Sequence, residues 1–156
     1  MADLLRHPAP MATNSGALLG VRILLVGADA DARGDSGAAL QILGGATVSA
    51  ATSAREALAM IVREPPHVLV TDLVMRDEDG QWLLERIRAL PPERGGAMPV
   101  VALTAAGSRH DGEGALAARF QAHLARPVEP AALCATVARV LRTGPHSTAA
   151  GGYSAV

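Results

Sequence analysis

The sequence is poor in cysteine, in aromatic residues and in excess charge of either sign. Its 156 residues include a single cysteine, Cys134, so no disulfide can form within the chain, and this fits a reducing compartment. Aromatic residues make up 2% and hydrophobic residues 49%, so we expect an aliphatic core. The net charge of −1 argues against a nucleic-acid-binding protein, which usually carries a clustered basic face.

Long apolar runs are also missing. No run approaches the roughly 20 residues that cross a bilayer, and the first residues, MADLLRHPAP, lack the apolar stretch of a secretory signal. We therefore expect a cytoplasmic protein with no membrane partner. Its natural start could be Met1 or Met11.

Periodic apolar residues are confined to the middle of the chain. Residues 1–20 lack a sustained period and predict a flexible lead-in, and residues 143–156 form a Gly/Ser/Ala tail. We expect one folded domain over 21–142, with both ends dispensable for folding.

Within this domain, short apolar runs alternate with helical patterns. Ser53 and Glu56 form a capping box at one helix start, and Pro130 suits the first turn of the last helix. Gly34 and Gly37 each cost about 1 kcal/mol relative to alanine in a helix interior, so we expect the first helix to begin late or to fray. Five strands alternating with five helices predict an α/β fold, a parallel sheet covered on both faces. The expected strands are 21–26, 46–51, 68–71, 99–103 and 122–125, and a helix is expected to end at 115–120.

In a doubly wound sheet, ligands bind at the carboxyl ends of the strands. The residues at these ends are Gly27, Ala28 and Asp29, then Asp72, then Thr104 and Ala105, then Arg126 and Pro127. The stretches VLVTDLVMRDEDG (68–80), PVVALTA (99–105) and FQAHLARPVEP (120–130) resemble the receiver domains of bacterial response regulators, of the chemotaxis-receiver type. The resemblance covers about 21–142 and implies a flavodoxin-like (βα)5 fold with strand order 2-1-3-4-5.

The resemblance implies a role for several residues. Asp72 occupies the position that accepts a phosphoryl group from a histidine kinase, and a carboxylate can act as such a nucleophile. Val74 would offer its backbone carbonyl to a metal ion held by Asp72. Thr104, Ala105 and Arg126 match the positions that bind the phosphoryl group and switch the domain.

The chain also departs from the family pattern. The usual acidic pair that holds Mg²⁺ is lost at Gly27 and Ala28, so we expect weak Mg²⁺ binding at best and slow phosphorylation. Arg126 replaces a lysine, and His123 stands at the switch-aromatic position. Arg76 and Arg119 replace a proline and a glycine.

Other acidic residues lie near these positions. Asp29 and Asp31 could supply the missing metal carboxylates, but a one-residue shift turns a side chain elsewhere, and helix capping is favoured. Residues 77–79 form an acidic loop that is either solvated or in contact with a metal through water. Arg126 is a surface cation or points into the site, where we predict a direct ion pair with Asp72.

The expected function is a stand-alone receiver in a two-component phosphorelay, with impaired Mg²⁺-dependent phosphorylation. The alternative is a phosphorylation-independent pseudo-receiver, a protein interaction module. Expected partners are a sensor histidine kinase or phosphotransfer protein and a downstream protein target, and a homodimer is possible. The chain is not expected to be an enzyme, since GADADARG lacks a dinucleotide fingerprint, and dehalogenase-type phosphatases carry their aspartate after the first strand.

Overall fold

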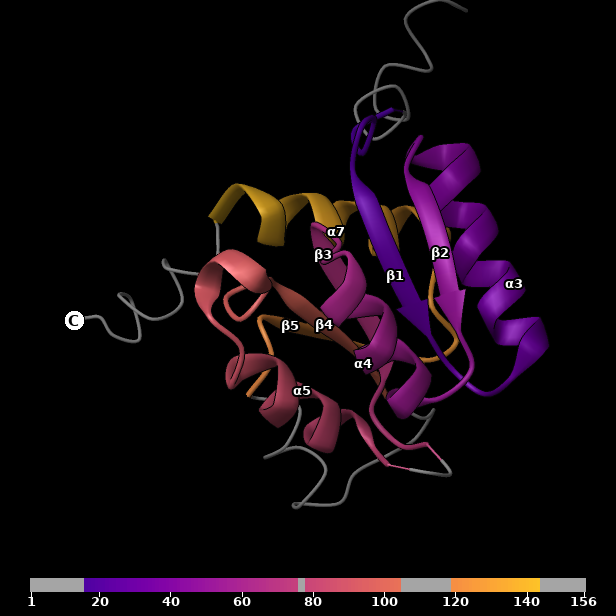
Figure 1. Ribbon diagram of the computed structural model, residues 1–156. Coiled ribbons are helices and arrows are strands. Elements are labelled where there is room, and N and C mark those ends of the chain that lie inside the picture. The colour runs from indigo at the N-terminus through magenta and orange to yellow at the C-terminus, as the bar shows by residue number, and fades with distance from the viewer. Residues whose placement is uncertain (1–15, 76–77, 105–118, 144–156) are drawn as a thin grey trace, which may run out of the picture.

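The computed structural model describes residues 16–75, 78–104 and 119–143, which form a five-stranded parallel sheet between two helical layers. The strand order is β2-β1-β3-β4-β5, as expected (Figure 1). The strands are β1 (Arg22–Val26), β2 (Thr47–Ala51), β3 (Val68–Asp72), β4 (Val100–Thr104) and β5 (Ala122–Ala125). Because all of them run in parallel, their carboxyl ends meet at one edge of the sheet.

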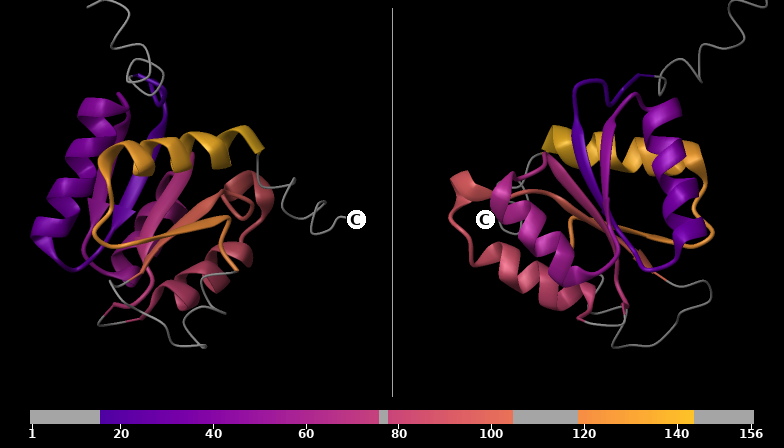
Figure 2. Two further views of the ribbon diagram at one scale, coloured as in Figure 1. Left: turned by 180° about the vertical axis from the view of Figure 1, so that it is seen from behind. Right: turned by 45° about the vertical axis from the view of Figure 1, so that its right-hand side comes forward.

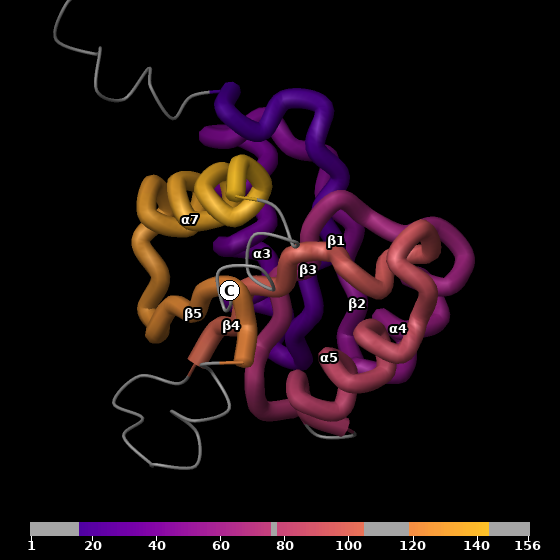
Figure 3. The backbone as a smooth tube through the Cα atoms, turned by 90° about the vertical axis from the view of Figure 1, so that its left-hand side faces the viewer, coloured from indigo at the N-terminus to yellow at the C-terminus, as the bar shows by residue number. Residues whose placement is uncertain are grey.

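Each face of the sheet is covered by helices, and the side view in Figure 3 shows the layers. One face carries α4 (Ala54–Arg63) and α5 (Gly80–Arg88), followed by a short 3-10 turn, η2 (Pro92–Arg94). The other carries α3 (Ala30–Ala38), which continues into a π-helical turn, η1 (Ala39–Leu43), and α7 (Pro130–Thr143) (Figure 2). The helix expected to end at 115–120 falls almost entirely outside the described residues, and the described Phe120 is buried.

Two aliphatic clusters fill the spaces between the layers. The middle strands are buried on both faces, which explains their continuous apolar runs. The cluster under α4 and α5 includes Leu24, Val26, Ile61, Leu69, Leu83, Ile87 and Val100. The cluster under α3 and α7 includes Leu18, Ile23, Leu25, Leu40, Val70, Leu103, Leu133 and Val137.

The helix starts follow the capping signals in the sequence. Ser53 caps α4 and accepts a hydrogen bond from the Glu56 N–H at 3.1 Å. The Glu56 carboxylate reaches back to Thr52, accepting from its N–H at 2.8 Å and its hydroxyl at 3.0 Å. Asp29 caps α3, which begins at Ala30, so the expectation of a late start is wrong. A well-formed cap offsets the low helix propensity of the glycines.

Residues 16–20, which precede the expected domain start at 21, contact the folded part of the chain. Residues 16–20 form turns, and Leu18 is fully buried in the cluster under α3 and α7. The Leu18 N–H donates to the Gly44 carbonyl at 2.8 Å, which ties this segment to the end of η1. The folded part therefore includes residues 16–20. Leu18 is buried there, although the residues around it show no apolar period.

None of the helices in the described ranges is long and apolar enough to cross a bilayer.

Leu18→Ala should lower the free energy of unfolding by about 2–5 kcal/mol, because it removes a buried side chain and leaves a cavity. Leu19→Ala is the matched control, since Leu19 is 77% exposed. Urea unfolding of both variants measures the difference. Equal stability of the two would show that residues 16–20 do not pack in solution.

The pKa of Glu56 is lowered by the backbone and side-chain hydrogen bonds from Thr52, with a smaller contribution from the charge of Arg33. A carboxyl whose pKa is lower in the folded than in the unfolded state stabilises the fold above its unfolded pKa, and this is lost as the pH falls through the folded value. Glu56→Gln should therefore lower the melting temperature at neutral pH, and the difference from the native chain should vanish in acid. Glu64→Gln, at the exposed C-terminal end of α4, is the control. A difference that persists in acid would contradict this assignment.

Candidate functional site

Asp72 ends β3, and backbone contacts hold it there. The next residue, Leu73, donates its N–H to the Leu103 carbonyl at 2.9 Å and accepts from the Gly80 N–H at 2.7 Å. A Cβ at Gly80 would lie 2.8 Å from the Asp72 carbonyl oxygen, so only glycine allows α5 to begin this close. The Asp72 side chain is 16% exposed.

Arg126 forms an ion pair with Asp72. Its backbone N–H donates to the Thr104 carbonyl at 2.9 Å, which fixes the start of the segment after β5. Its guanidinium Nη2 donates to Oδ1 of Asp72, and its side chain is 27% exposed. The predicted ion pair is confirmed, and Arg126 is not a free surface cation.

Thr104 is buried at the end of β4. Asp72 pairs with Leu103 in the sheet, so Thr104 lies one residue beyond, at the same edge as the carboxylate. The Thr104 hydroxyl donates to the Leu124 carbonyl at 3.4 Å, a long bond toward β5. Ala105, expected beside it, lies outside the described residues.

The two positions of the lost acidic pair carry no metal ligand in their side chains. Gly27 is buried and Ala28 is exposed. Asp29 accepts hydrogen bonds from the N–H groups of Asp31 and Ala32 at 2.9 and 3.3 Å, so it acts as a helix cap, as favoured. Asp31 is exposed.

Arg33 is a site residue that the sequence analysis missed. Its Nη1 donates to the backbone carbonyl of Gly27 at 2.6 Å. The available signal was its position: a long cationic side chain one turn into the helix that follows β1 can reach back to the end of that strand. Arg33 thus binds the carboxyl end of β1, and Arg126 binds that of the neighbouring β3.

The donor set does not fit Mg²⁺, which prefers carboxylates and water in octahedral geometry. One oxygen of the Asp72 carboxylate is bonded to Arg126, and the Gly27 carbonyl is bonded to Arg33. Val74, whose carbonyl was expected to bind a metal, is 69% exposed. Within 16–75, 78–104 and 119–143, no three His, Cys, Asp or Glu residues are grouped so that they could hold a metal.

Two acidic residues of the loop before α5, Glu78 and Asp79, make contacts within the fold. Asp79 caps α5 by accepting from the Trp82 N–H at 2.9 Å. Glu78 forms an ion pair with Arg55 at 2.9 Å, and the Arg55 guanidinium lies 5.1 Å from the centre of the Trp82 ring. The Arg86 guanidinium lies 5.2 Å from the centre of the same ring, and this tryptophan is half-buried. Arg76 and Asp77 are outside the described residues.

The two remaining departures from the family pattern lie on the surface. His123 is on the exposed side of β5, and its expected place as a switch residue stays a prediction. Arg119 lies 3.8 Å from Glu85 of α5, a surface contact that contributes little.

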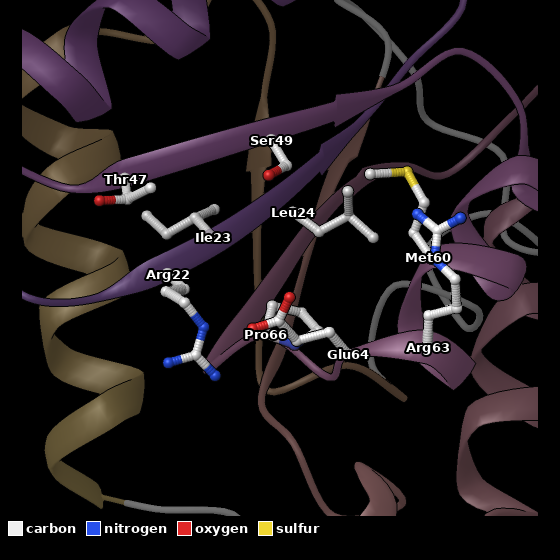
Figure 4. A pocket seen from close by; sticks show the side chains of 9 residues that line it. All are labelled: Arg22, Ile23, Leu24, Thr47, Ser49, Met60, Arg63, Glu64 and Pro66. Carbon is white, nitrogen blue, oxygen red and sulfur yellow. The ribbon is translucent and has the colours of Figure 1, made fainter.

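A groove of about 470 Å³ opens at the other end of the sheet, beside the first residues of β1 and β2. Figure 4 shows Arg22 and Thr47 at one end of it and Met60 and Arg63 at the other. Arg22 is held by the Pro65 carbonyl at 3.0 Å and by the ring of His67. None of the predicted site residues lines this groove.

Comparison with known proteins agrees with the fold. The family described as response regulator receiver domain matches residues 23–138. An uncharacterized 14.6 kDa protein in the sodA1 3′ region of Leptolyngbya boryana is 42% identical over 86 residues, which are 55% of this chain and 64% of that protein. The match thus spans less than two thirds of that relative's length.

Solved structures extend the similarity over most of the chain. A putative response regulator from Chloroflexus aurantiacus has a TM-score of 0.72 at 27% identity, covering 78% of this chain and 98% of its own. A CheY-like response regulator receiver domain protein from Methanospirillum hungatei has a TM-score of 0.68 at 26% identity, covering 80% and 94%. The chain belongs to the response regulator receiver domain family.

Proposed function

We propose that this chain is a receiver module that signals through contacts with other proteins, and that Arg126 holds its Asp72 site in one arrangement without phosphate. The ion pair between Arg126 and Asp72 carries this proposal. In phosphoryl transfer, a carboxylate oxygen of Asp72 must attack the phosphorus in line with the leaving group. One of the two Asp72 oxygens is already bonded to the Arg126 guanidinium. Without a Mg²⁺ ion to neutralise charge, transfer to Asp72 is slow as well as hindered.

A second candidate is the phosphorelay receiver with impaired, slow phosphorylation of Asp72. The observation in its favour is that β3 and β4 remain in register, with Thr104 one residue beyond the partner of Asp72. The acceptor and the hydroxyl thus still lie at one edge of the sheet. In this case a phosphotransfer partner would displace the guanidinium before transfer.

Both candidate functions imply the same kinds of protein partner and the same cellular location. Upstream would be a sensor histidine kinase or phosphotransfer protein, and downstream a protein target in the cytoplasm. The module itself would carry out no turnover, because its role is to be recognised. A homodimer is a further form in which such a module could act.

Acetyl phosphate with Mg²⁺ separates the two candidates. We expect the intact chain to gain almost no mass of a phosphoryl group, because Asp72 is paired with Arg126 and the metal ligands are missing. Intact-protein mass spectrometry follows the reaction, with Asp72→Asn as the control for modification elsewhere. Stoichiometric modification that disappears in Asp72→Asn would favour the phosphorelay and refute the proposal.

Metal binding gives a separate measurement. We expect Mg²⁺ titration, followed by amide chemical shifts around Asp72, not to saturate at sub-millimolar metal. Combining Ala28→Asp with Arg126→Ala should strengthen binding clearly, because it adds one carboxylate and frees another. Tight binding by the native chain would instead show that Asp31 or the 77–79 loop supplies ligands.

A further inference from the structure

We propose that Gly27 and Arg33 are positioning residues of the Asp72 site, which is built from two arginines in place of a metal ion. Gly27 leaves the space in which the Asp72 carboxylate lies, and Arg33 holds the backbone that borders this space. The proposal deepens the proposed function and rests on it, because it explains what keeps the ion pair with Arg126 in place.

The space beside Gly27 is occupied by the carboxylate itself. A Cβ built on Gly27 would lie 2.7 Å from Oδ2 of Asp72 and 3.3 Å from its Cγ. Carbon–oxygen contacts this short do not occur, so any side chain at this position must displace the carboxylate. Arg126 bonds to Oδ1 and Gly27 faces Oδ2, so the two residues together place both oxygens.

The backbone does not need glycine at this position. Positive φ values occur at Gly16, Gly20, Gly45 and Gly95, and Gly27 is not among them. An alanine could adopt the same backbone conformation, and among the described residues the contact closer than 3.0 Å is with Asp72. This points to the site, and not to the turn after β1, as the reason for a glycine here.

Arg33 packs over the same glycine. Its Nη1 donates to the Gly27 carbonyl at 2.6 Å, and its Cγ lies 3.5 Å from the position of a Cβ on Gly27. Its own place is set by the Asp29 cap, since the Arg33 N–H donates to the Asp29 carbonyl at 2.9 Å in the first turn of α3. Contacts therefore run from the Asp29 cap to Arg33, from Arg33 to Gly27, and from Gly27 to the Asp72 carboxylate.

The arrangement places a cation of the chain itself beside the carboxylate. The Arg126 guanidinium pairs with Asp72, and the Arg33 guanidinium binds the Gly27 carbonyl next to it. One carboxylate oxygen that could bind Mg²⁺ is thus already paired with a guanidinium, and the carbonyl at the end of β1 has a second guanidinium donor. An added cation would meet repulsion in addition to missing ligands.

The test compares Gly27→Ala with Gly34→Ala by NMR of the full chain. Among the described residues, a Cβ on Gly34 in α3 would meet no atom within 4 Å outside its own helix, so this variant adds a methyl group near the site without contacting it. At constant pH, Gly27→Ala should shift the Asp72 carboxyl carbon and abolish the slowed rotation of the Arg126 guanidinium that marks a paired arginine. Gly34→Ala should leave both signals as in the native chain. Native signals in Gly27→Ala would overturn the proposal.

A double-mutant cycle covers the case in which Gly27→Ala is too unstable for NMR. Gly27→Ala should lower the melting temperature in the native chain but much less in an Asp72→Ala background, where the carboxylate is gone. Equal losses in both backgrounds would overturn the role of Gly27.

Arg33 is tested with Arg33→Gln and Arg33→Lys. The glutamine variant should weaken the Arg126 signal, and lysine, which still donates to a carbonyl, should restore part of it. No change in Arg33→Gln would remove Arg33 from the site. All these measurements use unphosphorylated protein, so they can succeed or fail independently of the acetyl phosphate result that decides the proposed function.

Discussion

The ion pair between Asp72 and Arg126 joins residues 54 positions apart, at the ends of two strands that are not neighbours in the sheet. Because β4 lies between β3 and β5, the pair must cross the carboxyl end of β4, where Thr104 is found. A half-buried carboxylate is stabilised by a cation or by hydrogen-bond donors nearby. In this chain the cation is the side chain of Arg126. Gly27, Arg33 and the Asp29 helix cap lie beside the same carboxylate or hold the backbone next to it.

Much of the fold could be predicted because its signals are local. Apolar runs marked the strands. Ser53 and Glu56 marked one helix start through hydrogen bonds that span only a few residues, and Pro130 marked another because its fixed φ suits a first helical turn. The predicted strand order followed once the chain resembled a known family. Leu18 escaped prediction for the opposite reason: its burial depends on a cavity formed by η1 and the sheet, which no pattern within residues 16–20 encodes.

The site was predictable at the level of positions and less so at the level of contacts. Parallel strands bring Asp72, Thr104 and Arg126 to one edge whatever their side chains do, and removing two acids leaves Asp72 as the natural partner of a nearby arginine. Arg33 was missed because its contact is with a backbone carbonyl, and carbonyls are the same at every residue. Gly27 was interpreted from sequence as a lost ligand. In the structure its missing Cβ is what makes room for Oδ2 of Asp72.

A tethered cation and a dissolved one control such a site differently. Mg²⁺ binds reversibly, so its occupancy follows the metal concentration and the negative charge around it. A guanidinium on the same chain stays close to Asp72 at any metal concentration, and it stays charged throughout the physiological pH range. To free the carboxylate, a partner must either move the segment after β5 or offer Arg126 a better acceptor. The second route suits an incoming phosphoryl group, whose oxygens bind guanidinium in the same forked geometry. The first route requires no phosphate. A partner that uses neither route would meet the intact ion pair as a fixed feature of the surface.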